Sequence, residues 1–330
     1  MTGLFDHLVG QGRAVALLTA SLDQGRLAPA YLFAGPDGVG RRLAALRFLE
    51  GVLAGPAGDG AVRRRLQEGN HPDLLWVEPT YQEKGQLVPA SKAEELGLAR
   101  RGAPQLRLEQ IREVSRFLSR RPVQARGCLV VLEGVEAMAE GAANALLKTL
   151  EEPADGLLIL IAAAPDRLLT TIRSRCQSVP FTPLTPEQLA LVLERCGEPP
   201  PSQDPPELLE LAAGSPGALL HCRQVWAALP AGLAERLLAL AASADPLEAL
   251  GLARDLAEAL DAEQQLWLLG WWQLALWRRQ ALWCRQPPVA HLQRLERLRS
   301  QLGAYVQPRL AWEVALLELA SWASLGSSRQ

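Results

Sequence analysis

The apolar residues of the chain form two kinds of pattern, short continuous runs and longer stretches with helical spacing. Runs of about four to eight apolar residues bounded by turn residues are typical of buried strands. The expected strands are residues 30–34, 74–77, 128–132, 157–164 and 177–181. Between them apolar residues recur at helical spacing, as with Ile111, Val114 and Leu118. Helices are expected over residues 11–26, from Arg41 to about Ala54, from Leu108 onward, and over residues 141–152.

This alternation of strands and helices predicts an α/β fold with a parallel sheet, because consecutive parallel strands need a crossover between them. The strands are apolar along most of their length, so helices are expected to cover both faces of the sheet. Residues 79–104 interrupt the alternation with repeated Pro and Gly and with mixed charges that follow no clear period. This segment is expected to be a long surface loop.

The remainder of the chain is expected to be all-α. No strand pattern follows Phe181, and Thr185 and Pro186 have the residue types of a helix N-cap and first helical position. From about Trp226 to Ser324 Leu and Ala dominate, with breaks near prolines. The expected domains are residues 1–181, 182–226 and 227–330.

Composition is that of an ordinary globular protein, with 48% hydrophobic and 21% charged residues in a chain of 330. The net charge of −2 gives no overall basic signal for nucleic acid, so any DNA contact would need a local patch. The five cysteines form no Cys-x-x-Cys pair, which argues against a zinc site or a disulfide framework. No secretory signal and no run of about 20 apolar residues is present, so a cytoplasmic protein without a membrane partner is expected. Tryptophans between Trp267 and Trp283 are interpreted as packing residues.

Residues 35–42, Gly-Pro-Asp-Gly-Val-Gly-Arg-Arg, have the glycine spacing of a phosphate-binding loop between a strand and a helix. Such a loop directs backbone N–H groups and a helix N-terminus at phosphate. Its working form ends in Gly-Lys-Ser or Gly-Lys-Thr, where the lysine reaches phosphate and the hydroxyl holds Mg²⁺. Arg41 and Arg42 occupy those two positions here. The glycines are expected to serve the strand–helix turn itself: Gly35, Gly38 and Gly40.

Four motifs occur together and in order in the first half of the chain. They are Phe33-Ala34-Gly35 with its loop, His71-Pro72-Asp73, residues 143–153 (Ala-Asn-Ala-Leu-Leu-Lys-Thr-Leu-Glu-Glu-Pro), and Ser174-Arg175-Cys176. In these motifs the chain closely resembles the delta-prime family of bacterial DNA polymerase III clamp-loader subunits, which are AAA+ proteins. The resemblance covers residues 1–181. It implies a RecA-like AAA+ domain, followed by a small helical lid and a helical C-terminal collar domain.

The resemblance also implies a degenerate nucleotide site. Active members carry one acidic residue for Mg²⁺ and a glutamate that polarises water after a buried strand. Here Glu133 is the candidate for the first role, and Gly134 has no side chain for the second. Residues 162–164, all Ala, and Pro216 stand where active relatives place a polar sensor and a lid arginine. ATP is therefore not expected at the chain's own site, and no other cofactor is expected.

Arg175 is the position where the family's chemical group is retained. In the family, the arginine of Ser-Arg-Cys lies at the subunit edge and reaches the ATP of the next subunit. There it neutralises charge that develops on the transferring phosphoryl group. Ser174 is expected at the same interface. Further positions expected to face a neighbouring subunit or DNA are Asn144, Lys148, Glu151, Glu152, Arg112 and Arg116, with Arg120 continuing the four-residue arginine spacing.

One departure concerns zinc. Family members commonly carry a four-cysteine zinc module between the loop helix and the His-Pro-Asp segment. Residues 51–73 contain no cysteine, so zinc is not expected. Residues 63–70 are expected to form a shortened loop or helix.

The expected function is that of a non-hydrolysing delta-prime-like subunit that helps load the sliding clamp onto primed DNA. The implied partners are the motor subunits, the clamp-opening subunit, the clamp and, through the complex, primed DNA. Three other interpretations remain open: an active AAA+ ATPase that tolerates Arg41, a passive nucleotide-binding subunit, and a small P-loop transferase. The last leaves the helical C-terminal third unexplained. No paired carboxylates suggest a polymerase site, so any DNA polymerase activity would belong to the holoenzyme.

Overall fold

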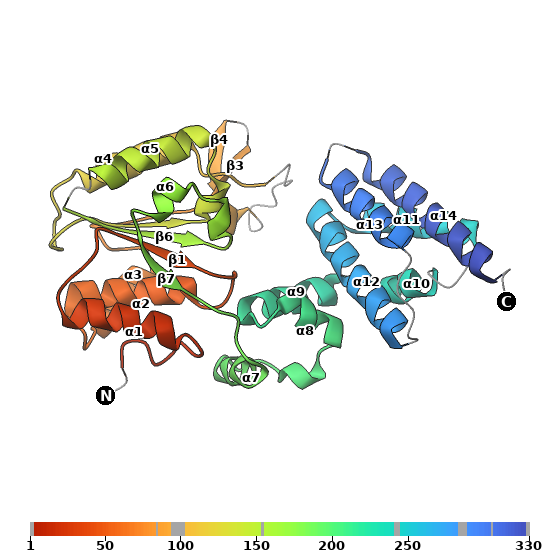
Figure 1. The fold of residues 1–330 in the computed structure, drawn as a ribbon, viewed down its shortest axis with the longest axis horizontal. Helices are drawn as coiled ribbons and strands as arrows, with labels where there is room; N and C mark the ends of the chain where they lie inside the picture. Colours follow the sequence, from red (N-terminus) through yellow and green to blue (C-terminus); the bar gives the residue numbers. More distant parts are fainter. Residues whose placement is uncertain are drawn as a thin grey trace. The chain divides into compact units, whose positions relative to one another are not determined.

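The computed structural model describes residues 3–83, 85–93, 103–152, 155–240, 245–282, 289–304 and 306–327 (Figure 1). The chain divides into two compact units, residues 1–200 with 214–217 and residues 201–213 with 218–330. The first unit contains the sheet, and the second is built of helices in its described part. The division into three domains, with boundaries after residues 181 and 226, stays a prediction.

The first unit is organised around a five-stranded parallel sheet, as the alternation of strands and helices predicts. Its strands are β1 (Ala30–Ala34), β2 (Leu74–Val77), β5 (Leu129–Glu133), β6 (Leu157–Ala162) and β7 (Gln177–Pro180). They lie in the order β2-β5-β6-β1-β7. Leu32 of β1 is paired with Leu160 of β6 on one side and with Ser178 of β7 on the other. Every residue of β6 is buried, which explains its continuous apolar sequence.

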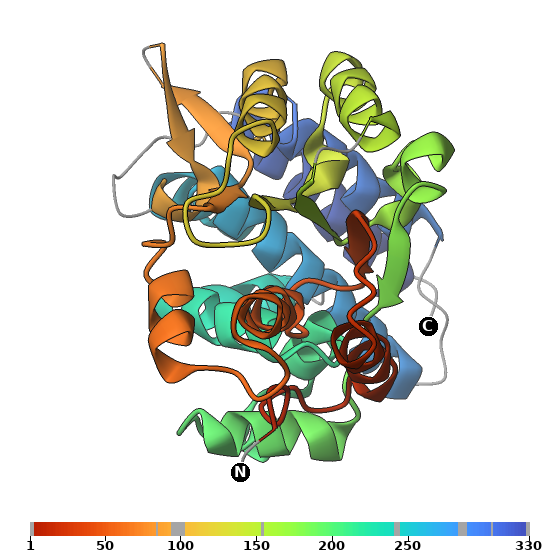
Figure 2. The same cartoon turned by 90° about the vertical axis from the view of Figure 1, so that its left-hand side faces the viewer.

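Helices cover both faces of this sheet (Figures 1 and 2). One face carries α1 (Gly12–Asp23), α2 (Arg41–Ala54) and α3 (Gly60–Gln67), and the other α4 (Leu108–Leu118), α5 (Glu140–Glu151) and α6 (Thr170–Arg173). On the second face Leu32, Ile111 and Leu146 belong to one buried apolar cluster. On the first face the rings of Tyr31 and Phe48 meet edge-on at 4.9 Å. Successive residues of β1 thus fill opposite faces, as the two-residue period of a strand requires.

Part of the segment predicted as a long surface loop is a β-hairpin. β3 (Thr80–Glu83) and β4 (Gln86–Pro89) pair in antiparallel register, and a short 3₁₀ helix, η1 (Ala90–Lys92), follows them. The backbone N–H of Thr80 also donates to Gln105 O at 2.9 Å, and that of Gln105 to Thr80 O at 3.1 Å. This pairing joins residues far apart in the sequence, so no local periodicity indicated it. The prediction was wrong for residues 80–83 and 85–92, and residues 84 and 94–102 lie outside the described part.

A buried carboxylate connects α2 to α3 in the segment where the family's zinc module would lie. Glu50 is fully buried and accepts from Arg47 at 3.0 Å and from the Nε and Nη2 atoms of Arg63 at 2.9 Å each. It also accepts the backbone N–H of Asp59, the residue that caps α3. Burial opposes ionisation of Glu50, but the two guanidinium groups hold its pKa below the usual value. Of the two predicted alternatives for residues 63–70, a shortened loop or a helix, the structure has a helix, α3, up to Gln67. No cluster able to hold a metal occurs among the described residues.

The helix that follows the sheet begins as predicted. α7 (Pro186–Arg195) has Thr185 as its N-cap, and the Thr185 Oγ1 accepts the N–H of Gln188 at 3.3 Å. The Gln188 side chain in turn accepts the N–H of Thr185 at 3.1 Å, which completes a capping box.

The second unit consists of helices in the part that the structure describes. They are α8 (Pro206–Ala212), α10 (Leu233–Leu240), α11 (Pro246–Ala259), α12 (Ala262–Leu282), α13 (Val289–Leu302), α14 (Pro308–Ser327) and most of α9 (Pro216–Ala228). Trp272 and Trp312 are fully buried, and the Trp312 indole donates to Gln265 at 2.9 Å. This confirms the packing interpretation for Trp272, whereas Trp277 is 51% exposed and Trp283 lies outside the described residues. No helix in the described ranges is long and apolar enough to cross a membrane.

Asp73, from the His-Pro-Asp motif, holds the irregular segment before β5. Its carboxylate is buried and accepts the backbone N–H groups of Val123, Gln124 and Ala125 at 2.6, 2.7 and 2.7 Å. Burial opposes its ionisation, but these three donors outweigh the effect and lower the pKa of Asp73. The motif therefore has a structural use in this chain, because one buried carboxylate accepts three backbone hydrogen bonds from an irregular segment.

Replacing Asp73 with Asn should lower the free energy of unfolding by about 3 kcal/mol, because an amide offers one acceptor oxygen to three donors. Urea denaturation at neutral pH measures the difference. Asp59→Asn is the matched control: Asp59 is exposed and caps α3 through the N–H of Ala61. Asn caps a helix about as well as Asp, so this change should stay within about 0.5 kcal/mol.

The wild-type chain and Asp73→Asn should also differ in how much stability they lose in acid. A lowered folded pKa means that the stabilisation from Asp73 is fully present above the unfolded pKa of about 3.9 and is lost as the pH falls through the folded value. Between neutral pH and about pH 3 the wild-type chain should therefore lose more stability than Asp73→Asn. Equal losses would contradict the role of the carboxylate.

Candidate functional site

The glycine loop lies between β1 and α2, as the motif predicts, and its geometry depends on close backbone contact. A Cβ atom built on Gly35 would lie 2.3 Å from the carbonyl oxygen of Phe181, the residue that follows β7. The N–H of Phe181 donates to Ala34 O at 2.7 Å, so the two backbones are held against each other. Gly35 also has φ of +151°. The sheet itself therefore requires this glycine, whether or not the loop binds phosphate.

Arg41 occupies the position of the phosphate-binding lysine, and its side chain is turned into the protein. It is 5% exposed and forms an ion pair with Asp37, four residues earlier in the same loop. Asp37 itself is highly exposed. The sequence leaves the direction of the Arg41 charge open, and the structure pairs that charge with the loop's own carboxylate. An arginine held in this way does not reproduce a lysine ammonium that reaches out to phosphate.

Arg42 occupies the position of the Mg²⁺-binding hydroxyl, and it pairs with the acid that would share that metal. Its Nη1 atom lies 3.3 Å from Glu133 Oε2, and its guanidinium lies 4.8 Å from the centre of the Trp76 ring. Burial raises the pKa of Glu133, and the positive charge of Arg42 opposes that rise. A guanidinium thus faces Glu133 where a metal ion would otherwise be bound. The residues present do not fit a Mg²⁺ site.

Gly134 takes the place of the water-polarising glutamate, and no side chain can be added there without strain. Its φ is +59°, and an added Cβ would lie 2.7 Å from Cγ of Pro79 at the base of the β3–β4 hairpin. At the end of β6 the N–H of Ala163 donates to Glu136 at 2.9 Å. Only one carboxylate oxygen of Glu136 is paired in this way, and its Oε2 atom is buried with no hydrogen-bond partner among the described residues.

The segment Gly214–Gly217 is hydrogen-bonded directly to the loop. Ser215 Oγ donates to Asp37 O at 2.6 Å, and the N–H of Gly217 donates to Gly38 O at 3.1 Å. This segment contains Pro216, at the position where active relatives use a lid arginine. The sequence showed that the lid arginine is absent. It did not predict the hydrogen bonds from Ser215 and Gly217 to the loop, because Ser215 and Asp37 are 178 positions apart.

Most of the predicted loop residues line one cavity of about 480 Å³, with Gly35 the exception. Gly38, Gly40, Arg41, Arg42 and Glu133 all contribute to its wall. The cavity also receives three further carboxylates, those of Asp37, Glu78 and Glu136. Four carboxylates thus face two guanidinium groups that are already paired. This balance of charge disfavours a polyphosphate.

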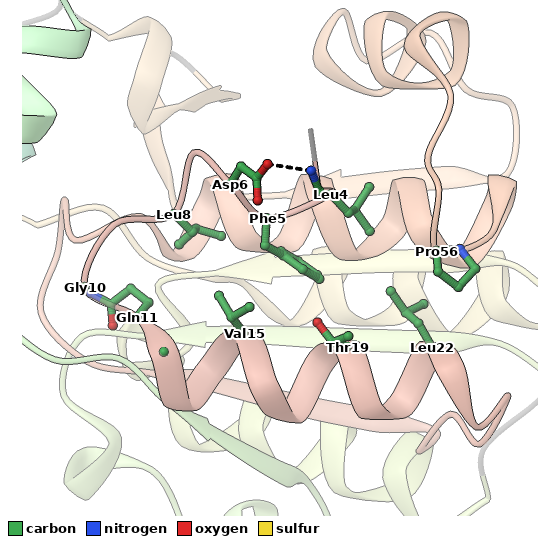
Figure 3. Close-up of a pocket in the computed structure, with 12 residues that line it drawn as sticks. Leu4, Phe5, Asp6, Leu8, Gly10, Gln11, Val15, Thr19, Leu22 and Pro56 are labelled. Carbon is green, nitrogen blue, oxygen red and sulfur yellow. Dashed lines mark hydrogen bonds between the residues drawn. The ribbon is translucent and has the colours of Figure 1, made fainter. Parts of the chain in front are cut away.

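A second cavity, of about 490 Å³, lies between the N-terminal segment and α1 (Figure 3). Phe5 and Leu8 face Val15 and Leu22 across it, and the lining is mostly apolar. None of the predicted nucleotide-site residues lines this cavity, which separates it from the loop chemistry.

Arg175 follows α6 and is held at the surface by two contacts. Its Nη2 atom lies 2.9 Å from Glu151 Oε1, and its Nη1 atom donates to Thr171 O at 3.0 Å. Ser174 is exposed beside it and also donates to Thr171 O. Cys176 points the other way into the apolar cluster, where burial raises its pKa to about 11. The motif therefore exposes its arginine and packs its partly buried cysteine against the apolar cluster.

The other predicted interface residues fall into two places. A groove of about 970 Å³ between α4 and α5 is lined by Arg112, Arg116, Asn144 and Lys148, together with Glu109 and Glu152. Glu151 is not part of that lining and pairs with Arg175 instead. The regular arginine spacing ends before Arg120, because α4 ends at Leu118, and the Arg120 guanidinium lies over the Phe117 ring at 5.5 Å. The contact face of Arg112, Arg116 and Arg120 stays a prediction.

Comparison with known families finds two matches along the chain. Residues 10–185 match the family described as "DNA polymerase III, delta subunit", and residues 187–319 match "Cyanobacterial DNA polymerase III delta prime, C-terminal domain". The DNA polymerase III subunit delta' of Bacillus subtilis (strain 168) is 36% identical over 185 residues, which are 54% of this chain and 50% of the relative. The subunit of the same name from Pseudomonas aeruginosa is 35% identical over 200 residues, covering 57% and 54%. The chain matches only about half the length of these relatives.

Among solved structures, a DNA polymerase III gamma subunit-related protein from Thermotoga maritima has a similar fold. Its TM-score is 0.50 with 18% identity, and the match covers 94% of this chain and 99% of that protein. At this identity the likeness concerns the fold alone. It agrees with the predicted RecA-like AAA+ sheet followed by helices.

Because Gly217 lies against the loop, Gly217→Ala should destabilise the protein. Gly217 is the second residue of α9, and an added Cβ would lie 2.7 Å from the Cα of Gly38. Because the backbone at Gly38 would have to move to make room for the Cβ, the change should lower the free energy of unfolding by about 1–3 kcal/mol.

Gly141→Ala provides the matched control. Gly141 is the second residue of α5, and an added Cβ would meet nothing within 4 Å. Alanine should be neutral there or stabilise by up to about 1 kcal/mol. Chemical denaturation of both variants measures the contrast, and equal effects would show that Gly217 does not press against the loop.

Proposed function

The chain belongs to the delta-prime family of DNA polymerase III subunits, and from this premise we propose that it is a clamp-loader subunit that does not hydrolyse ATP itself. It supplies Arg175 in trans to the ATP site of a neighbouring motor subunit. In this role it helps hold and open the sliding clamp at primed DNA. The names of the two delta' relatives support the assignment to the DNA polymerase III assembly.

The pairing of Arg42 with Glu133 carries the non-hydrolysing half of the proposal. A motor site needs a metal at this point, bound between a hydroxyl and an acid. Here the acid already faces a positive charge on the protein, and no second carboxylate stands at Gly134. Each missing hydrogen bond to a charged group is worth about 1.5–3 kcal/mol, so two or three together remove several orders of magnitude in affinity or rate.

Exposure of Arg175 supports the role in trans. Its side chain is 36% exposed, and it does not line the cavity of the chain's own loop. A guanidinium at the surface is available to phosphate on another subunit, whereas Arg41 is not. The two halves of the proposal thus rest on different residues, Arg42 with Glu133 for the absence of hydrolysis and Arg175 for the role in trans.

The groove between α4 and α5 is proposed as a contact surface of the assembly. Arg112, Arg116 and Lys148 bring three positive charges to it, and Glu109 and Glu152 bring two negative charges. The positive charges in the groove support contact with DNA phosphates, because Lys and Arg bind phosphate independently of the base sequence. Asn144, between them, adds a neutral hydrogen-bonding group.

Calorimetric titration of the purified chain with Mg-ATP tests the proposal that the chain does not hydrolyse ATP itself. No heat of binding is expected up to about 1 mM, because the charges that would receive phosphate and metal are already paired within the protein. A non-hydrolysable analogue in parallel separates binding from turnover. Micromolar binding without turnover would favour a passive nucleotide subunit, and steady hydrolysis would favour an active ATPase.

Arg175→Ala tests the second half in the reconstituted clamp loader. Hydrolysis at the ATP site next to this chain should fall by about 10³-fold or more, as when an arginine finger is lost. The measurement is ATPase stimulated by clamp and primed DNA, with assembly checked by size-exclusion chromatography. Arg173→Ala is the matched control, because Arg173 lies two positions away and pairs only with the exposed Asp166 in the described structure. Unchanged hydrolysis with Arg175→Ala would disprove the finger.

A further inference from the structure

Arg175 is not a freely moving surface side chain, because two elements fix its guanidinium. Glu151 is the last residue of α5, and its Oε1 atom accepts from Nη2 at 2.9 Å. Thr171 belongs to α6, and its carbonyl accepts from Nη1 at 3.0 Å. The two acceptors bind different nitrogens, so they restrict rotation of the guanidinium plane as well as its position.

These contacts leave donors available. A guanidinium carries five N–H groups. Glu151 and Thr171 take one each in the described structure, so three remain for an incoming anion. Arg175 can thus keep both internal contacts while it donates to phosphate oxygens, and it does not have to leave Glu151 before it can act.

From this arrangement we infer that Glu151 is a positioning residue that holds Arg175 in the orientation required at the neighbouring ATP site. The inference rests on the proposed function of Arg175 and adds a residue to it. A donor aimed in advance at developing charge needs no reorganisation during the reaction. Glu151 would contribute through orientation, since its negative charge alone would weaken the attraction of Arg175 for phosphate.

The ion pair between Arg173 and Asp166 lies in the same part of the fold and provides a comparison for the pair between Arg175 and Glu151. Arg173 lies 3.1 Å from Asp166, whose side chain is 90% exposed, and the described structure records no second acceptor for Arg173. Arg175 has two acceptors on two helices, and Glu151 is more covered than Asp166, at 51% exposure. Asp166→Asn therefore serves as the matched control for Glu151 variants.

The experiment uses the reconstituted clamp loader with Glu151→Ala, Glu151→Gln, Asp166→Asn and Arg175→Ala, together with the double variant Glu151→Ala/Arg175→Ala. Glu151→Ala should lower kcat of clamp- and DNA-stimulated hydrolysis by about tenfold, up to about 10²-fold, with little change in KM for ATP. Glu151→Gln keeps an acceptor oxygen at the same place and should retain most of the rate. Asp166→Asn should leave the rate unchanged.

The double variant distinguishes positioning from a general structural effect. If Glu151 acts only through Arg175, the double variant should be no slower than Arg175→Ala alone. A further loss in the double variant, or an equal loss with Asp166→Asn, would overturn the inference. An unchanged or faster rate with Glu151→Ala would also overturn it.

Failure of the inference and failure of the proposed function give different patterns. If Arg175→Ala abolishes hydrolysis at the neighbouring site while Glu151→Ala does not affect it, the finger stands and the positioning role falls. If Arg175→Ala has no effect, the finger itself falls. Thermal melting of the isolated variants should agree with wild type within about 2 °C, since exposed pairs add little to stability.

Discussion

Backbone contact at the glycine loop is the constraint on which the first unit depends. The chain leaves β1, turns, and enters α2 while the residue after β7 presses its carbonyl against Gly35. On the other side, Gly217 of α9 meets Gly38 of the loop. Any side chain at either contact would displace backbone. The glycine signature of a phosphate loop thus persists for steric reasons, and it carries no information about nucleotide by itself.

Once the loop's shape is fixed, the placement of charge decides its chemistry. Arg41 and Arg42 are each paired with a carboxylate of the same unit, and the surrounding cavity has more carboxylates than guanidinium groups. Arg175 has a carboxylate partner as well, and at 36% exposure it is less exposed than Arg42 at 61%, so exposure alone does not separate the two. They differ in place, because Arg42 pairs with the acid of the chain's own cavity, whereas Arg175 does not line that cavity and keeps donors for another molecule. The proposed division of labour follows from this difference.

Irregular segments of the first unit are held by buried carboxylates. Glu50 accepts hydrogen bonds from Arg47, Arg63 and the residue that caps α3, in the segment where other family members commonly carry a zinc module. Asp73 collects three backbone donors ahead of β5. In both places the desolvation of a carboxylate is offset by several donors at once, and removal of a single partner would leave charge or N–H groups unsatisfied. A polar cluster of this kind can take over the organising role of a metal without any cysteine.

The sequence by itself determined the features that depend on neighbouring residues. Local patterns predicted a strand over residues 157–164, of which the structure forms 157–162, together with the N-cap at Thr185, the loop with its two arginines, and the Ser-Arg-Cys motif. The hairpin at β3–β4 was missed, since its first strand is secured by Gln105. Only the tertiary structure decided that Arg42 meets Glu133, that Ser215 meets Asp37, and that Glu151 meets Arg175. A side chain's partner depends on which distant segments the fold brings within hydrogen-bond distance, and local periodicity contains no record of that proximity.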